Sequence, residues 1–151
     1  MTAVHHSAIC VRDVDASLRF YRDGLGLQTL MDQSFDGDWP TLFDAPASRL
    51  RSVFLGDPDR PDTGIVELVA FDVAPPGERM AGGREVSAPL APGFFLLSFF
   101  VDVDETLARI ERLGLARDPR RIEVAGPAGP VSMATLRDPD GVLVELVGAP
   151  A

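Results

Sequence analysis

The chain of 151 residues is 46% hydrophobic and 25% charged, a balance typical of a folded protein that forms one compact domain or two small modules sharing a core. Its net charge of −9 argues against a nucleic-acid partner, and because all 14 basic residues are arginine, a Schiff-base lysine and a phosphate loop with its lysine are excluded. No apolar run approaches the roughly 18 residues that span a bilayer, and the first residues lack the pattern of a secretory signal. The single cysteine, Cys10, excludes an internal disulfide. We therefore expect a cytoplasmic protein without a membrane partner.

Residues 1–72 predict a first module with the order β-α-β-β-β. Runs of apolar and β-branched residues predict its strands, and a segment with apolar residues on one helical face predicts its helix. Asp13 or Asp15 is placed to cap the start of that helix, and Gly24 and Gly26 are placed to end it. The expected strands are residues 4–11, 27–35, 49–55 and 65–71, and the expected helix is residues 16–23.

Residues 36–48 interrupt this module with turn-forming glycine and proline residues. Because the segment also carries Trp39 and Phe43, we expect a loop or short helix there. A connection of this length that carries aromatic side chains covers a pocket more often than it merely joins two strands.

Residues 73–93 are dense in proline and glycine, which predicts a linker between two modules. The β-α-β-β-β pattern then restarts in residues 94–151. The expected strands are residues 94–101, 120–125, 131–137 and 142–147, and the expected helix is residues 105–113, ended by Gly114.

The last strand of each predicted module carries a glutamate at the same point. Thr63–Phe71 and Asp140–Val147 are each a turn signal followed by an apolar run, with Glu67 in one and Glu145 in the other. A carboxylate inside such a run costs free energy unless something compensates its charge. Its presence at equivalent points of two copies indicates a shared role.

Alternation along the first strand predicts His6 and Cys10 on one face and His5 on the other. Taken singly, these residues have ordinary explanations. His6 alone is expected as a partly buried histidine bonded to a backbone carbonyl. Glu67 or Glu145 alone is expected to pair with an arginine such as Arg49 or Arg51.

Two modules that open with a histidine before a strand and close with a glutamate within one resemble the vicinal oxygen chelate superfamily, which includes glyoxalase I, epimerases, extradiol dioxygenases and bleomycin-resistance proteins. The most telling stretches are residues 6–21 and 137–145. The resemblance implies an α+β fold in which two β-α-β-β-β modules form a curved mixed eight-stranded sheet around a cup-shaped cavity, and it commonly implies a homodimer.

The resemblance places metal ligands at His6, Glu67 and Glu145, for a divalent ion such as Zn, Ni, Co, Mn or Fe. The remaining ligand position of the family falls on Leu96, which cannot bind a metal. Because Fe(II) in extradiol dioxygenases is held by two histidines and one carboxylate, that activity is improbable for this chain.

The resemblance also implies which side chains line the cup. On the second module's first strand, Phe95 and Phe99 are expected in the core, and the residues that alternate with them are expected to face the cavity. With the aromatic segment of the first module, the expected pocket residues are Cys10, Phe35, Trp39, Phe43, Phe94, Leu96, Ser98 and Phe100.

The resemblance, together with these residues, suggests three functions. The first is a glyoxalase-like or epimerase-like enzyme that acts on a small vicinal-oxygen or carbonyl compound, with Glu67 or Glu145 as the catalytic base and a metal ion that stabilises the enolate. The second is a metal-free protein that binds small molecules in the cup, as bleomycin-resistance proteins do. The third is a metal-independent natural-product tailoring enzyme with His6 and a glutamate as its acid–base pair.

Overall fold

The computed structural model describes residues 2–73 and 93–148, and the chain divides into two compact units, residues 1–76 and 77–151. Each unit is a four-stranded mixed sheet with helices, so the predicted α+β class with two modules is confirmed. The predicted linker, apart from its end residues Val73 and Gly93, lies outside the described residues.

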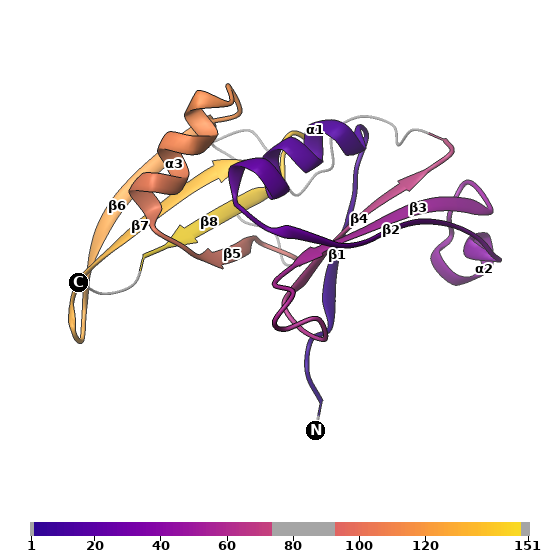
Figure 1. The fold of residues 1–151 in the computed structure, drawn as a ribbon, viewed down its shortest axis with the longest axis horizontal. Coiled ribbons are helices and arrows are strands. Elements are labelled where there is room, and N and C mark those ends of the chain that lie inside the picture. The colour runs from indigo at the N-terminus through magenta and orange to yellow at the C-terminus, as the bar shows by residue number, and fades with distance from the viewer. Residues whose placement is uncertain (1, 74–92, 149–151) are drawn as a thin grey trace. The chain divides into compact units, whose positions relative to one another are not determined.

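The first unit contains one sheet with the strand order β1-β4-β3-β2 (Figure 1). Strand β1 runs parallel to β4, whereas the other neighbours are antiparallel. Its elements in chain order are β1 (His6–Cys10), α1 (Val14–Leu18), the π-helical segment η1 (Arg19–Gly24), β2 (Gln28–Asp36), α2 (Trp39–Phe43), β3 (Arg49–Gly56) and β4 (Ile65–Phe71).

Asp13, not Asp15, is the residue that caps the first helix. Its Oδ1 accepts hydrogen bonds from the backbone amides of Asp15 and Ala16, at 3.0 and 3.1 Å. The helix therefore begins at Val14, two residues earlier than expected, and continues through η1. At the end of η1 the amide of Leu25 donates a hydrogen bond to the carbonyl of Phe20, five residues back, which is the spacing of a π-helix. Gly26 follows with a φ of 90°, a left-handed conformation that glycine adopts without a steric penalty.

The core of the first unit lies between the helical segment and one face of its sheet. Phe20 and Tyr21 are fully buried, with their ring centroids 5.0 Å apart in an edge-to-face arrangement. The sheet contributes alternating residues such as Val53 and Leu68, which are also fully buried. The opposite face, which carries His6 and Glu67, is left more open.

The second unit repeats this plan with the strand order β5-β8-β7-β6, where β5 runs parallel to β8. Helix α3 begins at the cap Asp102 and is followed by Gly114 with a φ of 70°. Ile110 on the helix and Leu136 and Leu146 on the sheet are fully buried. The elements are β5 (Leu97–Phe100), α3 (Val103–Arg112), β6 (Arg117–Gly126), β7 (Gly129–Arg137) and β8 (Leu143–Val147).

The expectation that Phe95 lies in the core is wrong, because its side chain is 56% exposed. Strand β5 begins only at Leu97, three residues later than predicted, so the alternation of faces does not extend back to Phe95. Leu97 is the buried residue at the start of this strand, and Phe99 is half-buried.

The joining of the two sheets into one eight-stranded sheet around a cup stays a prediction.

None of the helices in residues 2–73 and 93–148 has the length and apolar character that crossing a bilayer requires.

An ion pair on the edge strand β2 offers a test of the first unit by pH. Arg51 donates two hydrogen bonds to the carboxylate of Asp32, at 2.8 and 2.7 Å, and these bonds lower the pKa of that carboxyl. Both side chains are about 40% exposed, so water screens the pair and we expect Asp32→Asn to cost about 0.5 kcal/mol at neutral pH.

The sign of the pH dependence follows from the lowered pKa. The stabilisation is complete above the unfolded pKa of about 3.9 and is lost as pH falls through the lower folded value. Urea unfolding at pH 7 and below pH 4 should therefore show a difference between wild type and Asp32→Asn that shrinks with acid. The exposed turn variant Asp62→Asn is the control, and an equal difference at both pH values would contradict the prediction.

Candidate functional site

The parallel pairing of β1 with β4 brings His6 and Glu67 together. In this register His6 lies opposite Ile65 and Ala8 lies opposite Glu67, so the histidine and the glutamate are two pairs apart and share a face. Nε2 of His6 lies 3.3 Å from Oε2 of Glu67, and the two side chains are 39% and 15% exposed. The sequence-predicted pair is therefore a direct contact within the first unit.

Ser52 on β3 holds the other oxygen of Glu67. Its hydroxyl donates a hydrogen bond to Oε1 at 2.5 Å, and the residue is 2% exposed. Oε1 of Glu67 therefore contacts Ser52 and Oε2 contacts His6, and these two contacts fix the orientation of the carboxylate. Sequence reasoning missed Ser52, because the long turn between β3 and β4 leaves the register of these strands open.

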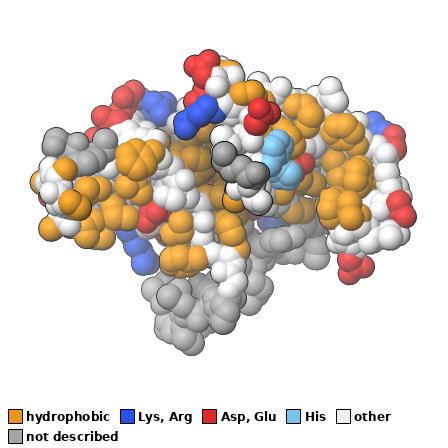
Figure 2. Space-filling view, turned by 90° about the horizontal axis from the view of Figure 1, so that it is seen from below, with side chains coloured by type: hydrophobic (Ala, Val, Ile, Leu, Met, Phe, Trp, Pro, Cys, Tyr) orange, Lys and Arg blue, Asp and Glu red, His pale blue; other side chains and the backbone are white. Residues whose placement is uncertain are grey.

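The prediction that His5 points to the opposite face from His6 is wrong. Its Nδ1 lies 2.8 Å from Nδ1 of His6, and both imidazoles lie near the ring of Phe54, with centroid distances of 6.0 and 5.5 Å. Strand β1 begins at His6, so the alternation of the strand does not govern His5. Figure 2 shows the two histidines as an exposed pair on the surface.

In the second unit Glu145 has one hydroxyl partner. Ser98 on β5 lies opposite Glu145 on β8 and donates a hydrogen bond to its Oε2 at 2.7 Å. Ser98 thus occupies the place that Ala8 has opposite Glu67, and Leu96 precedes it by two residues, as His6 precedes Ala8. By this count along the chain, Leu96 stands at the position equivalent to His6.

A tight turn before β8 sets the position of Glu145. The buried carboxylate of Asp138 accepts hydrogen bonds from the amides of Asp140 and Val142, at 2.9 and 2.8 Å. Gly141 within this turn has a φ of 88°, where a side chain would be strained. Pro139 and Asp140 therefore lie in a turn that is stabilised by the side chain of the residue before them, Asp138.

The ordinary explanations of these residues do not hold in the structure. His6 is exposed, with His5 and Glu67 as partners, so it is not a buried histidine bonded to a backbone carbonyl. Arg49 pairs with Asp36 and Arg51 pairs with Asp32, so neither arginine pairs with a glutamate of the predicted site.

His6 and Glu67 fit one half of a metal site. Two donor atoms that each lie about 2.0–2.2 Å from one ion are themselves about 3–3.5 Å apart, which matches the 3.3 Å between Nε2 and Oε2. An imidazole with a carboxylate suits Zn, Ni, Co, Mn and Fe. Among residues 2–73 and 93–148, no group of three or more histidine, cysteine, aspartate or glutamate side chains is gathered for a metal. The first unit therefore brings together two of the three predicted ligands, and the third, Glu145, belongs to the second unit.

The pocket residues predicted in the first unit lie at two places. Cys10 is half-buried on the face of β1 that carries His6. Trp39 and Phe43 stack within α2, with centroids 5.6 Å apart, and the indole Nε1 donates to the carbonyl of Phe35 at 3.3 Å. The segment predicted as a loop or short helix is thus a short helix that carries a preformed aromatic pair.

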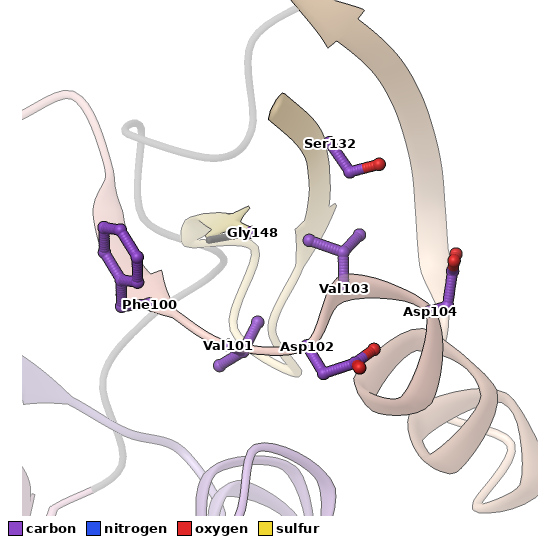
Figure 3. A pocket seen from close by; sticks show the side chains of 7 residues that line it. All are labelled: Phe100, Val101, Asp102, Val103, Asp104, Ser132 and Gly148. Atoms are coloured by element: carbon purple, nitrogen blue, oxygen red, sulfur yellow. The ribbon is translucent and has the colours of Figure 1, made fainter. Parts of the chain in front are cut away.

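The pocket residues predicted in the second unit follow one another along β5 and the segment before it. Phe94 and Leu96 precede β5, Ser98 contacts Glu145, and Phe100 is 76% exposed at the end of the strand. Phe100 lines an open pocket of about 380 Å³ at the start of α3 (Figure 3). Its lining is residues 100–104 with Ser132 and Gly148, which includes no other residue of the predicted site.

A family model described as the Glyoxalase/Bleomycin resistance protein/Dioxygenase superfamily matches residues 3–146. The chain belongs to this superfamily. The lactoylglutathione lyase-like protein terB of Aspergillus terreus is 36% identical to it over 154 residues, which cover 98% of this chain and 76% of that protein.

Solved structures show the same fold. A glyoxalase family protein from Bacillus cereus is 19% identical, with a TM-score of 0.73, and the match covers 100% of this chain and 96% of that one. Glyoxalase I from Zea mays, solved as a mutant, is 20% identical with a TM-score of 0.68, over 99% of this chain and 45% of that one. These similarities confirm the predicted α+β fold of two repeated modules.

Proposed function

We propose that the protein is a glyoxalase-like lyase or isomerase that removes a proton from the carbon beside a carbonyl group of a small substrate. The observation that carries this proposal is the contact of His6 with Glu67, 3.3 Å apart on adjacent parallel strands. The superfamily match and the similarity to a lactoylglutathione lyase-like protein support an enzyme of this class.

In the proposed site His6, Glu67 and Glu145 would hold a divalent ion. When bound, such an ion acts as a Lewis acid that polarises the carbonyl oxygen and stabilises the negative charge of an enolate. The leucine at position 96 leaves the set at three protein ligands, which is the number typical of catalytic sites that keep an open position for water or substrate.

Glu145 is the better base of the two glutamates. Both oxygens of Glu67 have partners, since Oε1 accepts from Ser52 and Oε2 lies against His6. The hydroxyl of Ser98 contacts Oε2 of Glu145, so Oε1 would be free to take the proton of the substrate when the carboxylate swings off the ion. The same carboxyl would then return the proton to the neighbouring carbon, which completes an isomerisation.

A second candidate is a metal-free enzyme of the tailoring kind. The observation that favours it is again the contact between His6 and Glu67, because an imidazole beside a carboxylate is an acid–base pair in its own right. The leucine at the fourth ligand position also agrees with it. In this case His6 would deliver the proton and Glu67 would orient its ring.

Hydrogen exchange at the substrate carbon distinguishes the two candidates. The protein is incubated in D₂O with a panel of small α-hydroxy and α-keto carbonyl compounds, beginning with lactoylglutathione, and deuterium at the carbon beside the carbonyl is followed by NMR. The metal enzyme requires exchange that stops on chelation and returns with one of the divalent ions. Exchange that persists after chelation supports the metal-free candidate, and no exchange under either condition contradicts both.

A further inference from the structure

The imidazoles of His5 and His6 lie in hydrogen-bond contact through their Nδ1 atoms. Their Nδ1 atoms lie 2.8 Å apart, and the rings meet edge to face at 84° with centroids 5.1 Å apart. Two imidazole nitrogens at this distance form a hydrogen bond only if one carries the hydrogen and the other offers a lone pair. The tautomers of the two rings are therefore coupled.

The second nitrogen of His6 links this coupling to the proposed site. A neutral imidazole has one N–H, so the states of Nδ1 and Nε2 in His6 are opposite. If Nε2–H faces the carboxylate of Glu67 at 3.3 Å, Nδ1 must accept a hydrogen bond from Nδ1–H of His5. If Nε2 offers its lone pair to an ion, Nδ1 must instead donate to a lone pair on His5.

We propose that His5 is a positioning residue that reverses its hydrogen bond with His6 when a divalent ion binds, so that His6 can change tautomer without losing its partner. The metal-bound part of this inference rests on the proposed function. The neutral rings of both histidines keep one proton each in both states. In the change, His6 gives the proton on Nε2 to water and takes the proton from Nδ1 of His5, while Nε2 of His5 takes one from water.

The surroundings of His5 suit this role. The residue is exposed, so its protons exchange with solvent, whereas Glu67 is only 15% exposed and is held by Ser52. Phe54 lies beside both imidazoles and limits the directions in which they turn. A ligand histidine commonly donates its other N–H to an outer partner, and loss of that partner typically weakens metal binding about 10- to 100-fold.

The chain holds only two histidines, so their tautomers can be read directly from ¹⁵N–¹H correlation spectra. At about pH 8.5, above the range in which free histidine titrates, we expect Nε2–H on His6 and Nδ1–H on His5 in the metal-free protein. Addition of Zn²⁺ should give Nδ1–H on His6 and Nε2–H on His5. Spectra in which His5 keeps one tautomer throughout while His6 changes would overturn the proposal.

Variants of His5 provide the second readout. His5→Phe keeps a ring beside Phe54 but removes the acceptor, so we expect Zn²⁺ to bind about 10- to 100-fold more weakly and His6 to show both tautomers without metal. His5→Asn restores a group that donates and accepts near the position of Nδ1, and it should recover most of the affinity. Val4→Ala, at an exposed neighbouring position, is the control and should bind as the wild type does.

The outcomes separate this role from the proposed function. A wild-type protein that takes up no Zn²⁺ contradicts the metal site, while the tautomer of His6 in metal-free wild type and His5→Phe still tests the role of His5. Equal Zn²⁺ affinity and one unchanged His6 tautomer in His5→Phe would overturn the role of His5 even if the metal site exists.

Discussion

We expect replacement of Glu145 by glutamine to lower kcat by about 10²- to 10⁴-fold, the share that a positioned general base contributes to a reaction. Glutamine has the same size as glutamate, and its amide oxygen still accepts the hydrogen bond from Ser98. It cannot take a proton from the substrate. Turnover of the best compound of the exchange panel, measured for wild type and Glu145→Gln side by side, checks this result.

Two further variants show whether the loss belongs to the base. Glu123→Gln removes an exposed carboxylate from β6 of the same unit, so its activity should equal that of the wild type. Glu67→Gln should lower both activity and metal content, because Glu67 lies against His6. Full activity in Glu145→Gln, with thermal unfolding unchanged, would contradict the assignment of Glu145 as the base.

Replacement of His6 by alanine removes the sole imidazole in the proposed ligand set, and we expect metal affinity to fall by more than about 100-fold, beyond the effect of losing an outer partner. Metal bound per chain is measured by mass spectrometry after reconstitution with Zn, Ni, Co, Mn or Fe. The wild type should hold about one ion and His6→Ala less than a tenth of that amount.

The control for His6→Ala is again Val4→Ala, which leaves every proposed ligand in place. His6 lies on an exposed surface at the start of β1, so its loss should leave the midpoint of thermal unfolding unchanged in the metal-free protein. Equal metal content in wild type and His6→Ala would contradict the proposed ligand set. A wild type that binds none of the ions would contradict the metal enzyme and leave the metal-free enzyme as the remaining candidate.

The elements of the fold were predictable because each has a local signal. Residues 65–71 form an apolar, β-branched run between turn signals, which predicts a strand, and β4 has the same bounds. The start of β5 was predicted three residues too early, because consecutive apolar residues carry no mark of where strand pairing begins. That error placed Phe95 in the core instead of at the surface.

The error at His5 has the same origin and a larger consequence. A period of two assigns faces only within a paired strand, and β1 begins at His6. Once His5 lies outside the strand, its ring is free of the alternation and turns toward His6 and Phe54. An arrangement of this kind depends on the precise strand end, which local sequence leaves open by a few residues.

The sequence by itself determined the module repeat, the superfamily and the equivalence of Glu67 with Glu145, since these rest on patterns that recur within the chain. Only the tertiary structure decided which hydroxyl meets which carboxylate, with Ser52 on Glu67 and Ser98 on Glu145, and that two adjacent histidines face each other. The physical reason is that strand register and strand ends are set by pairing between distant segments, and a shift of a single residue exchanges the faces of every side chain.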